Sequence, residues 1–344
     1  MAFKKTTQKV DINKRKIING EDADVVQLYP IKHTFAWEAY NAANANHWLP
    51  TEISMQNDIE EWKSTKVLSH DERTALKIVL GFFTTADSIA ANNIVLGFYR
   101  HITSPECRLY LLRQGYEEAI HTHSYQYIVE SLRLNESEIF NMYRENQAIY
   151  NKDAFILSFN EGILNPHFKT GTVESDQKFL ENIIIASIIM EGIFFYSSFA
   201  VMFGFQRQNK LMGSAEQIQY IMRDESMHLN FGINLVNTIK EEQPELWSKE
   251  FQSHAIDLIK TGVELECTFA TEVFPKGIFG LNADNFRQYI QHIADRRLAR
   301  IGLSEQYRSP NPFPWMSEAI DLNKEKNFFE TRVIEYQTGG TLEW

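Results

Sequence analysis

Glu118-Ala-Ile-His121 and Glu225-Ser-Met-His228 are the two short stretches that decide the fold of this 344-residue chain. Both have the form Glu-x-x-His, and side chains three residues apart share one face of a helix. A single pair of this kind often arises by chance, and its ordinary interpretation is a solvated surface pair. Two such pairs in one chain raise the question of whether other acids stand near them.

Two further acids stand alone in apolar surroundings. Asp87 is the only charged residue between Ile78 and Tyr99, and Glu191 is the only one in residues 182–206. Membrane spans are one interpretation, because each stretch is near the ~20 residues needed, but the stretches contain several Asn, Ser and Thr residues. A core helix whose acid points outward is another. Helices that are apolar on nearly all sides are buried. Because a buried carboxylate is costly unless a cation meets it, the two acids together favour a shared cation.

Combined, the four sites form a recognisable ligand pattern. One acid from each of two helices, with a Glu-x-x-His pair from each of two others, is the inward arrangement of di-iron and di-manganese carboxylate bundles. Carboxylate oxygens with one imidazole for each metal suit iron or manganese better than zinc or copper. The sequence therefore predicts a dinuclear metal site. Its ligands would be Asp87, Glu118, His121, Glu191, Glu225 and His228.

Apolar residues at three-to-four spacing, with few helix breakers, predict an all-α fold, specifically a ferritin-like bundle of long helices. Ser69 with Glu72 makes a capping box that would start a helix running to about His101. Ser104-Pro105 would start the next helix, which reaches about Leu134. Further helices are expected at 138–150, 173–206, 216–240, 245–270 and 283–300.

Charge and composition exclude several classes of function. The 45 acidic and 34 basic residues give a net charge of −11, which argues against a nucleic-acid partner. The sequence contains no glycine-rich phosphate-binding motif. Cys107 and Cys267 lie far apart without a CxxC motif, which suits a reducing compartment. The basic start at 1–16 lacks the apolar stretch of a secretory signal. We therefore expect a cytoplasmic protein without membrane attachment.

A tyrosine and several apolar residues share helix faces with the ligands. Tyr125 is four residues after His121, one helical turn further along the same face. Apolar residues at four-residue spacing from Glu191 or Glu225 are Phe195, Phe199 and Ile221. All of these fit an ordinary core. They also fit an apolar pocket that would shield an oxidised tyrosine from quenching.

Two polar residues beside the ligands have less specific signals. Asp224 directly precedes Glu225 and is a candidate acceptor for the far nitrogen of a ligand histidine. Its alternative interpretation is a plain surface acid. His123 lies off the face that His121 and Tyr125 share, which favours packing or surface exposure over metal binding.

In this arrangement the chain resembles the small, radical-generating subunit of class I ribonucleotide reductase. The similarity extends from about Trp48 to Tyr336 and includes Gly280-Leu-Asn282 and the stretch 289–298. The motifs that match in order are Asp87, Glu118-Ala-Ile-His121 with Tyr125, Glu191 with Phe195 and Phe199, and Asp224-Glu225-Ser-Met-His228.

The resemblance implies a role for each matching residue. The first metal would be bound by Asp87, Glu118 and His121, and the second by Glu191, Glu225 and His228. Tyr125 corresponds to the residue that carries the stable radical. Trp48 corresponds to an electron-transfer tryptophan, coupled to the nearer metal through Asp224 and His121. Tyr336 corresponds to the tail tyrosine that passes the radical to the large subunit.

The pattern is similar to the chlamydial-type branch of that family, which has Phe in place of the radical tyrosine and uses a manganese–iron pair. Tyr220 and the Asn327–Arg332 tail belong to this likeness. The present chain departs from it, with Tyr125 at the radical position and Asp87 rather than Glu as first ligand. The departure favours two irons and a tyrosyl radical. A manganese–iron pair is the alternative, and the same ligands would also serve two manganese ions.

The resemblance further implies a small subunit of ribonucleoside-diphosphate reductase, whose radical is used by a separate large subunit to convert ribonucleotides to deoxyribonucleotides. Thr341-Leu-Glu-Trp344 would dock to that large subunit, and the chain would form a homodimer. The expected organisation is an N-terminal arm at 1–25, a helical domain at 26–312 and a flexible tail at 313–344.

Two other classes of protein remain as alternatives. Another di-iron carboxylate oxidase or oxygenase would act on its own bound substrate and would need no outbound radical route, so Trp48, Tyr125 and Tyr336 argue against it. Iron storage would require small subunits near half this length, assembled into a cage. A metal-free helical scaffold would show no bound metal.

Overall fold

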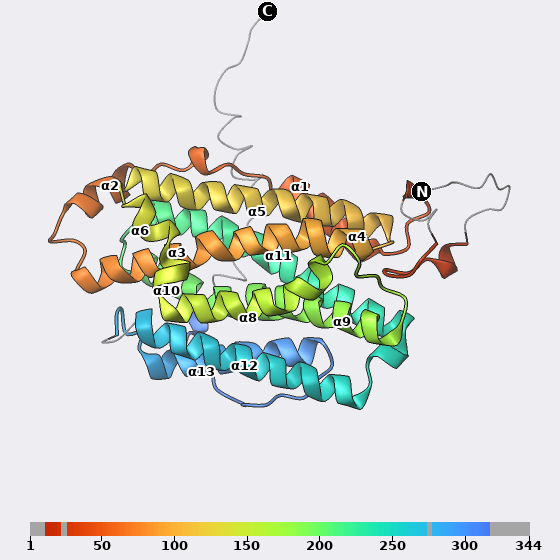
Figure 1. Ribbon diagram of the computed structural model, residues 1–344. Coiled ribbons are helices and arrows are strands. Elements are labelled where there is room, and N and C mark those ends of the chain that lie inside the picture. The colour runs from red at the N-terminus through yellow and green to blue at the C-terminus, as the bar shows by residue number, and fades with distance from the viewer. Residues whose placement is uncertain (1–10, 22–25, 274–276, 317–344) are drawn as a thin grey trace, which may run out of the picture.

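The computed structural model describes residues 11–21, 26–273 and 277–316, and within these ranges the chain is helical with no strand. Long helices run side by side, with α1 and α5 along one edge and α12 and α13 along the other (Figure 1). The α-helices are α1 Thr34–Ala45, α2 Gln56–Lys63, α3 His70–Asn92, α4 Tyr99–His101, α5 Pro105–Ser131, α6 Glu136–Phe140, α7 Met142–Glu145, α8 Gln147–Leu164, α9 Val173–Ile183, α10 Phe195–Arg207, α11 Met212–Glu242, α12 Lys249–Val273 and α13 Ala283–Arg300. Two π-helical segments, η4 Asn93–Phe98 and η5 Ile184–Phe194, connect α3 to α4 and α9 to α10. The all-α prediction is confirmed.

Helix starts follow local capping chemistry. The Ser69 hydroxyl accepts a hydrogen bond from the backbone N–H of Glu72 (3.2 Å), and the Glu72 carboxylate accepts one from the N–H of Ser69 (2.6 Å). Together they satisfy two donors at the helix start. The Ser104 hydroxyl caps α5, whose first residue is Pro105. Both predicted starts are confirmed, and α13 has the predicted bounds.

The chain between residues 136 and 164 differs from the single helix predicted at 138–150. The side chains of Asn135 and Asn146 each accept a hydrogen bond from the backbone N–H three residues further on. An Asn in this position starts a new helix. The result is the short α6 and α7, followed by a longer α8. Two other helices, α1 and α2, lie outside the predicted ones. Each buries few side chains, only Ala36 and Ala43 in α1 and only Asp58 in α2.

The two most apolar helical stretches form the centre of the bundle. By length and composition alone, His70–His101 and Val173–Arg207 could each cross a membrane, but 67% and 100% of their apolar windows are buried inside the structure. The first packs mainly on α5, and the η5 part of the second packs mainly on α11. The isolated acids Asp87 and Glu191 therefore lie in the core.

The segments η5 and α11 approach each other closely at Gly232. An ideal Cβ at this position would lie only 2.2 Å from the Cβ of Ser187. A residue without a side chain is therefore required here. This close packing brings the part of η5 that carries Glu191 next to the helix that carries Glu225 and His228.

The described ends of the chain pack on the bundle. Ile17 and Ile18 are buried ahead of α1, and Phe313 and Met316 are buried after α13. The predicted boundaries of the N-terminal arm and the tail stay predictions. Residues 1–10 and 22–25 of the arm, and the tail beyond Met316 with Tyr336 and the docking peptide 341–344, lie outside the described residues.

Candidate metal centre

Four helical stretches bring the six predicted ligands into one buried cluster. They are α3, α5, η5 and α11, and each of the six side chains is at most 2% exposed. Ligand atoms form two overlapping groups, each within 4.8 Å. The groups are Asp87, Glu118, His121 and Glu225, and Glu118, Glu191, Glu225 and His228. The residues Glu118 and Glu225 belong to both.

These two shared carboxylates each face both imidazoles. Oε2 of Glu118 lies 3.5 Å from Nδ1 of His121, and its Oε1 lies 3.2 Å from Nδ1 of His228. The corresponding distances from the two oxygens of Glu225 are 3.1 Å and 3.4 Å. Each of the two carboxylates therefore turns one oxygen toward each imidazole.

The ligand atoms are short of hydrogen-bond partners. Among the described residues, none is found for Nδ1 of either histidine, or for any carboxylate oxygen of Asp87, Glu118 and Glu225. Buried polar atoms are nearly always paired in native proteins, and leaving them unpaired is costly. Because these unpaired atoms are oxygen and imidazole donors, they fit a dinuclear iron or manganese centre.

The same cluster concentrates negative charge. Burial, together with the charges of Glu118 and Glu225, raises the pKa of Asp87 to about 7. Burial likewise raises the pKa of Glu191 well above its usual value. These directions mean that the interior disfavours so many ionised carboxylates unless cations accompany them. The electrostatics therefore agree with the hydrogen-bond pattern.

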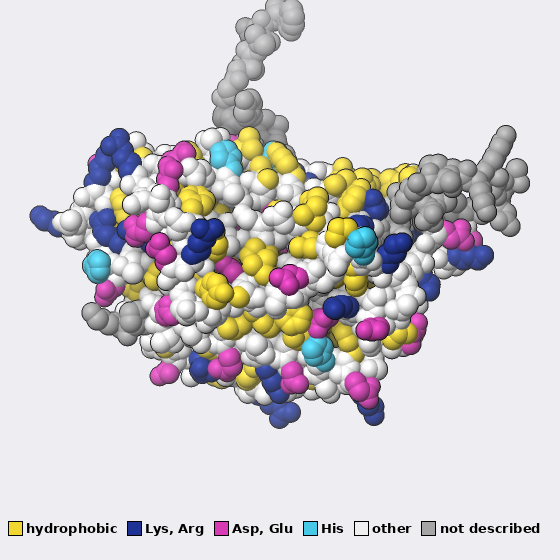
Figure 2. Space-filling view, viewed as in Figure 1, with side chains coloured by type: hydrophobic (Ala, Val, Ile, Leu, Met, Phe, Trp, Pro, Cys, Tyr) yellow, Lys and Arg dark blue, Asp and Glu magenta, His cyan; other side chains and the backbone are white. Residues whose placement is uncertain are grey.

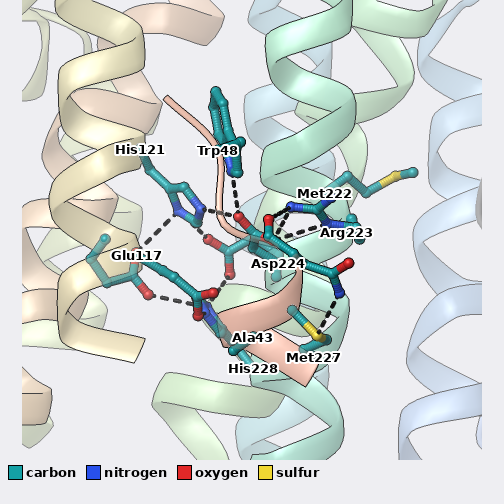
Figure 3. A network of polar contacts seen from close by, with 12 residues as sticks. Ala43, Trp48, Glu117, His121, Met222, Arg223, Asp224, Met227 and His228 are labelled. Atoms are coloured by element: carbon teal, nitrogen blue, oxygen red, sulfur yellow. Dashed lines mark hydrogen bonds and ion pairs between the residues drawn. The ribbon is translucent and has the colours of Figure 1, made fainter. Parts of the chain in front are cut away.

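Asp224 connects the cluster to Trp48 (Figure 3). Nε1 of Trp48 donates to Oδ2 of Asp224 at 2.8 Å, and the same oxygen lies 3.4 Å from Nε2 of His121. Arg223 donates to the other oxygen at 2.9 Å and 3.1 Å. Burial alone would raise the pKa of Asp224, but Arg223, His121 and Trp48 lower it to about 2. Asp224 is therefore an ionised acceptor, buried rather than on the surface.

Two residues outside the predicted site also contact ligands. Oε2 of Glu117 lies 3.0 Å from Nε2 of His228, and Nε2 of Gln114 donates to Oε1 of Glu191 at 3.0 Å. A signal for Glu117 is present in the sequence, because it directly precedes a ligand glutamate, as Asp224 does. No comparable pattern marks Gln114.

Tyr125 is buried against one aromatic ring, which itself packs on two others. Its side chain is fully buried and stacks on Phe83, with ring centroids 5.2 Å apart and planes 5° from parallel. Phe195 and Phe199 pack on the same Phe83 ring, at 5.7 Å and 5.5 Å. Burial, followed by the charge of Asp87, raises the pKa of Tyr125 well above its usual value, so the phenol stays protonated. No sequence pattern predicts the role of Phe83.

The remaining predicted residues have varied surroundings. Ile221 is fully buried in α11, and His123 is exposed on α5, off the ligand face. Tyr336 lies outside the described residues.

Comparison with known sequences gives one consistent result. The family model described as "Ribonucleotide reductase, small chain" matches residues 25–312. The chain is 54% identical over 337 residues to ribonucleoside-diphosphate reductase subunit beta of Chlamydia pneumoniae, covering 98% of this chain and 97% of that relative. It is 31% identical to the ribonucleoside-diphosphate reductase small chain of Plasmodium falciparum (isolate Dd2), with 96% and 90% covered.

Solved structures agree with the sequences. The ribonucleotide reductase R2 subunit from Clostridium botulinum superposes with a TM-score of 0.81 at 29% identity, covering 89% of this chain and 94% of that chain. Streptococcus sanguinis dimanganese(II)-NrdF superposes with a TM-score of 0.72 at 21% identity, covering 86% and 98%. At that lower identity the likeness is one of fold alone.

Proposed function

The chain belongs to the small chains of ribonucleotide reductase, with their ferritin-like fold, and serves as the small subunit of a ribonucleoside-diphosphate reductase; we propose that it stores a radical at Tyr125 beside a dinuclear metal centre. The observation that carries the proposal is the buried cluster in which both carboxylate oxygens of Asp87, Glu118 and Glu225 and Nδ1 of both ligand histidines have no hydrogen-bond partner among the described residues. The fully buried Tyr125 lies close enough for the charge of Asp87 to act on its phenol.

The six ligands divide between two metal positions. Asp87, Glu118 and His121 would hold one ion, and Glu191, Glu225 and His228 would hold the other. Glu118 and Glu225 belong to both ligand groups, so each would lie within reach of either ion. When bound, the two reduced ions would activate dioxygen, the oxidant of the reaction, which ordinary side chains cannot do. Two irons are the proposed pair, because a tyrosine is present to hold the radical, and a manganese–iron pair is the alternative.

Tyr125 holds the oxidising equivalent. Converting its phenol to the neutral radical removes one electron and the proton of the hydroxyl group, because burial keeps that hydroxyl protonated. The stacked Phe83 ring and the rings of Phe195 and Phe199 exclude water and reductants from this side. Their apolar surface, completed by Ile221, would prolong the lifetime of the radical.

The radical leaves through a chain of polar contacts. His121, Asp224 and Trp48 are joined by close contacts of 3.4 Å and 2.8 Å, which support electron transfer between the cluster and Trp48. Tyr336 then passes the radical to the large subunit, where ribonucleotides are reduced. The tail around Tyr336 and the peptide 341–344 provide the docking segment for that subunit.

A homodimer and a cytoplasmic location complete the proposal. An apolar patch on η4 and α5 supports the dimer. Its members, each about half exposed, are Val95, Leu96, Leu112 and Tyr116. Figure 2 shows hydrophobic side chains gathered along this edge of the molecule, and exposed patches of this kind mark protein interfaces. The two buried cysteines, Cys107 and Cys267, are not joined in a disulfide, which suits a reducing cytoplasm.

Electron paramagnetic resonance (EPR) with metal analysis tests the proposal. The protein would be loaded with ferrous iron, or with iron and manganese, exposed to air and examined for a dinuclear cluster and a tyrosyl signal. Tyr125→Phe should lose the tyrosyl signal and keep both metal ions. The matched control Tyr127→Phe, on the same helix, should keep the tyrosyl signal and both metal ions. Wild-type protein with neither cluster nor signal would refute the proposal.

Deleting the tail from residue 317 onward distinguishes a radical-donating subunit from an oxygenase with its own substrate. We expect the shortened protein to retain the metal centre and the tyrosyl signal but to give no ribonucleotide reduction with the large subunit. Undiminished turnover after the deletion would contradict the docking role of the tail.

A further inference from the structure

The metal centre is flanked by two similar polar arms. In the first arm, Arg223 donates to Asp224, and Asp224 lies 3.4 Å from Nε2 of His121. In the second arm, Nη2 of Arg113 donates to Oε1 of Glu117 at 3.2 Å, and Oε2 of Glu117 lies 3.0 Å from Nε2 of His228. Each ligand histidine thus has a carboxylate behind it, supplied by the neighbouring ligand helix.

Both arms end on the same helix. Nη2 of Arg113 donates to the backbone carbonyl of Ala43 at 3.0 Å, and Nη2 of Arg223 donates to that of Asn46 at 2.6 Å. Carbonyls at the C-terminal end of a helix have no partner within the helix, and here arginines from α5 and α11 satisfy two of them. The C-terminal end of α1 therefore fixes both arginines, and through them both carboxylates.

We propose that Glu117, held by Arg113, is the positioning residue for His228 and sets the metal affinity of the position that His228 serves. A proton on Nε2 of His228 is directed at Glu117, which leaves the lone pair of Nδ1 facing Glu118 and Glu225. A carboxylate behind a ligand imidazole fixes its tautomer and ring orientation and increases its basicity. The 3.0 Å contact is shorter than the corresponding 3.4 Å contact in the Asp224 arm.

The two arms differ in one respect that separates positioning from electron transfer. Asp224 also accepts from Trp48, so a variant at Asp224 would disturb both the ligand and the proposed radical route. Glu117 is hydrogen-bonded to Arg113 and His228. The inference rests on the proposed metal centre, and Glu117 tests the positioning effect of a carboxylate away from Trp48.

The experiment titrates Mn²⁺ into metal-free, full-length protein without oxygen. Calorimetry would give the affinity of each position, and EPR would distinguish isolated from coupled Mn²⁺. Glu117→Ala should weaken one of two positions by roughly 10–100-fold and leave isolated Mn²⁺ at the other. Glu117→Gln keeps an acceptor for His228 and should therefore weaken the Mn²⁺ affinity of that position less than Glu117→Ala does. The exposed Glu130→Ala on the same helix is the matched control and should bind as wild type.

Each result leads to a different conclusion. If Glu117→Ala binds two Mn²⁺ ions with wild-type affinity, the inference is wrong. It is also wrong if Glu117→Ala and Glu117→Gln weaken both positions equally while lowering the thermal stability of the metal-free protein, because that indicates a purely structural role. If wild-type protein itself binds no metal, the proposed metal centre fails, and the inference fails with it.

Discussion

At the scale of single residues, buried charge extends beyond the metal centre. Nζ of Lys152 in α8 lies 2.6 Å from Oε2 of Glu266 in α12, and both side chains are fully buried. The same ammonium lies 3.3 Å from the centre of the Phe82 ring, and Ser197 donates to Glu266. Burial lowers the pKa of Lys152 to about 8, although Glu266 opposes this shift. Neither residue has any part in the proposed mechanism.

Lys152→Met should lower the free energy of unfolding of the metal-free protein by about 3–5 kcal/mol, because Glu266 becomes a buried charge without a partner. The double variant Lys152→Met, Glu266→Gln should recover much of the loss, since the charge is gone and an acceptor for Ser197 remains. Denaturant unfolding measures both. A double variant no more stable than the single one would show that the unpaired charge is not the cause.

The site residues that the sequence predicts are those with unusual positions in it. Asp87 and Glu191 are conspicuous because each is the only charge in a long apolar stretch, and that property is visible without a structure. Gln114 and Phe83 are ordinary residues in ordinary helices, and their contacts depend on which helices become neighbours. Glu117 is intermediate, because its position beside a ligand is visible but its partner on α11 is not.

At the scale of helices, predictions from local chemistry succeed and those that depend on packing fail. Ser69 and Ser104 start helices through hydrogen bonds to residues three positions away, so their effect is contained in the sequence. The division at Asn146 follows the same capping rule, but an internal Asn is also common in uninterrupted helices. The π-helical bonding of η4 and η5 has no sequence pattern, since it arises where packed helices require an altered register.

The contact between η5 and α11 gives a prediction about helix packing. Gly232→Ala should destabilise the protein by about 1–3 kcal/mol, because the new methyl group would overlap Ser187. Gly162→Ala in α8 is the matched control. Its Cβ would meet only the flexible end of Lys178, at 3.2 Å, so it should be neutral or stabilising by up to about 1 kcal/mol. Thermal unfolding that ranks the two variants in the opposite order would contradict this account.

The segment ahead of α1 is held to the ends of α5 and α11 by a charged cluster around His33. Its ring lies 3.0 Å from Glu242 and 3.8 Å from Glu106, while Lys32 pairs with Glu242 and Arg15 lies near Glu106. Burial alone would lower the pKa of His33, but hydrogen bonds and charge from Glu106 and Glu242 raise it.

This cluster should make stability depend on pH. Because the pKa of His33 is higher in the folded state, its contribution is fully present below the unfolded value of ~6.5 and is lost as pH rises through the folded value. The stability difference between wild type and His33→Gln should therefore be larger near pH ~6 than near pH ~9. Unfolding at both pH values measures it, with the exposed His123→Gln as control. A difference that grows with pH would have the wrong sign.

At the scale of the whole molecule, the apolar patch on η4 and α5 predicts that two copies of the chain form a homodimer through this surface. Leu96→Glu places a charge in the patch and should convert the proposed dimer to monomer, because an unpaired charge is costly in a buried interface. Val173→Glu, also at an exposed apolar position but at the start of α9, should leave the dimer intact. Sedimentation analysis distinguishes the outcomes. A monomeric wild type, or a dimeric Leu96→Glu variant, would contradict the prediction.

The π-helical segment η5 also determines which changes of chain length the bundle can accept. Each i→i+5 hydrogen bond of η5 joins residues one position further apart than in an α-helix. If one residue before Glu191 were lost, the segment would return to α geometry and Glu191 would keep its place. Loss of one residue between Glu118 and His121 in α5 would rotate the imidazole about 100° around the helix relative to Glu118, so the two side chains would no longer share a face. We therefore expect single-residue gaps in the sequences of relatives to fall in η5 and to be absent from the turn Glu118–His121 of α5.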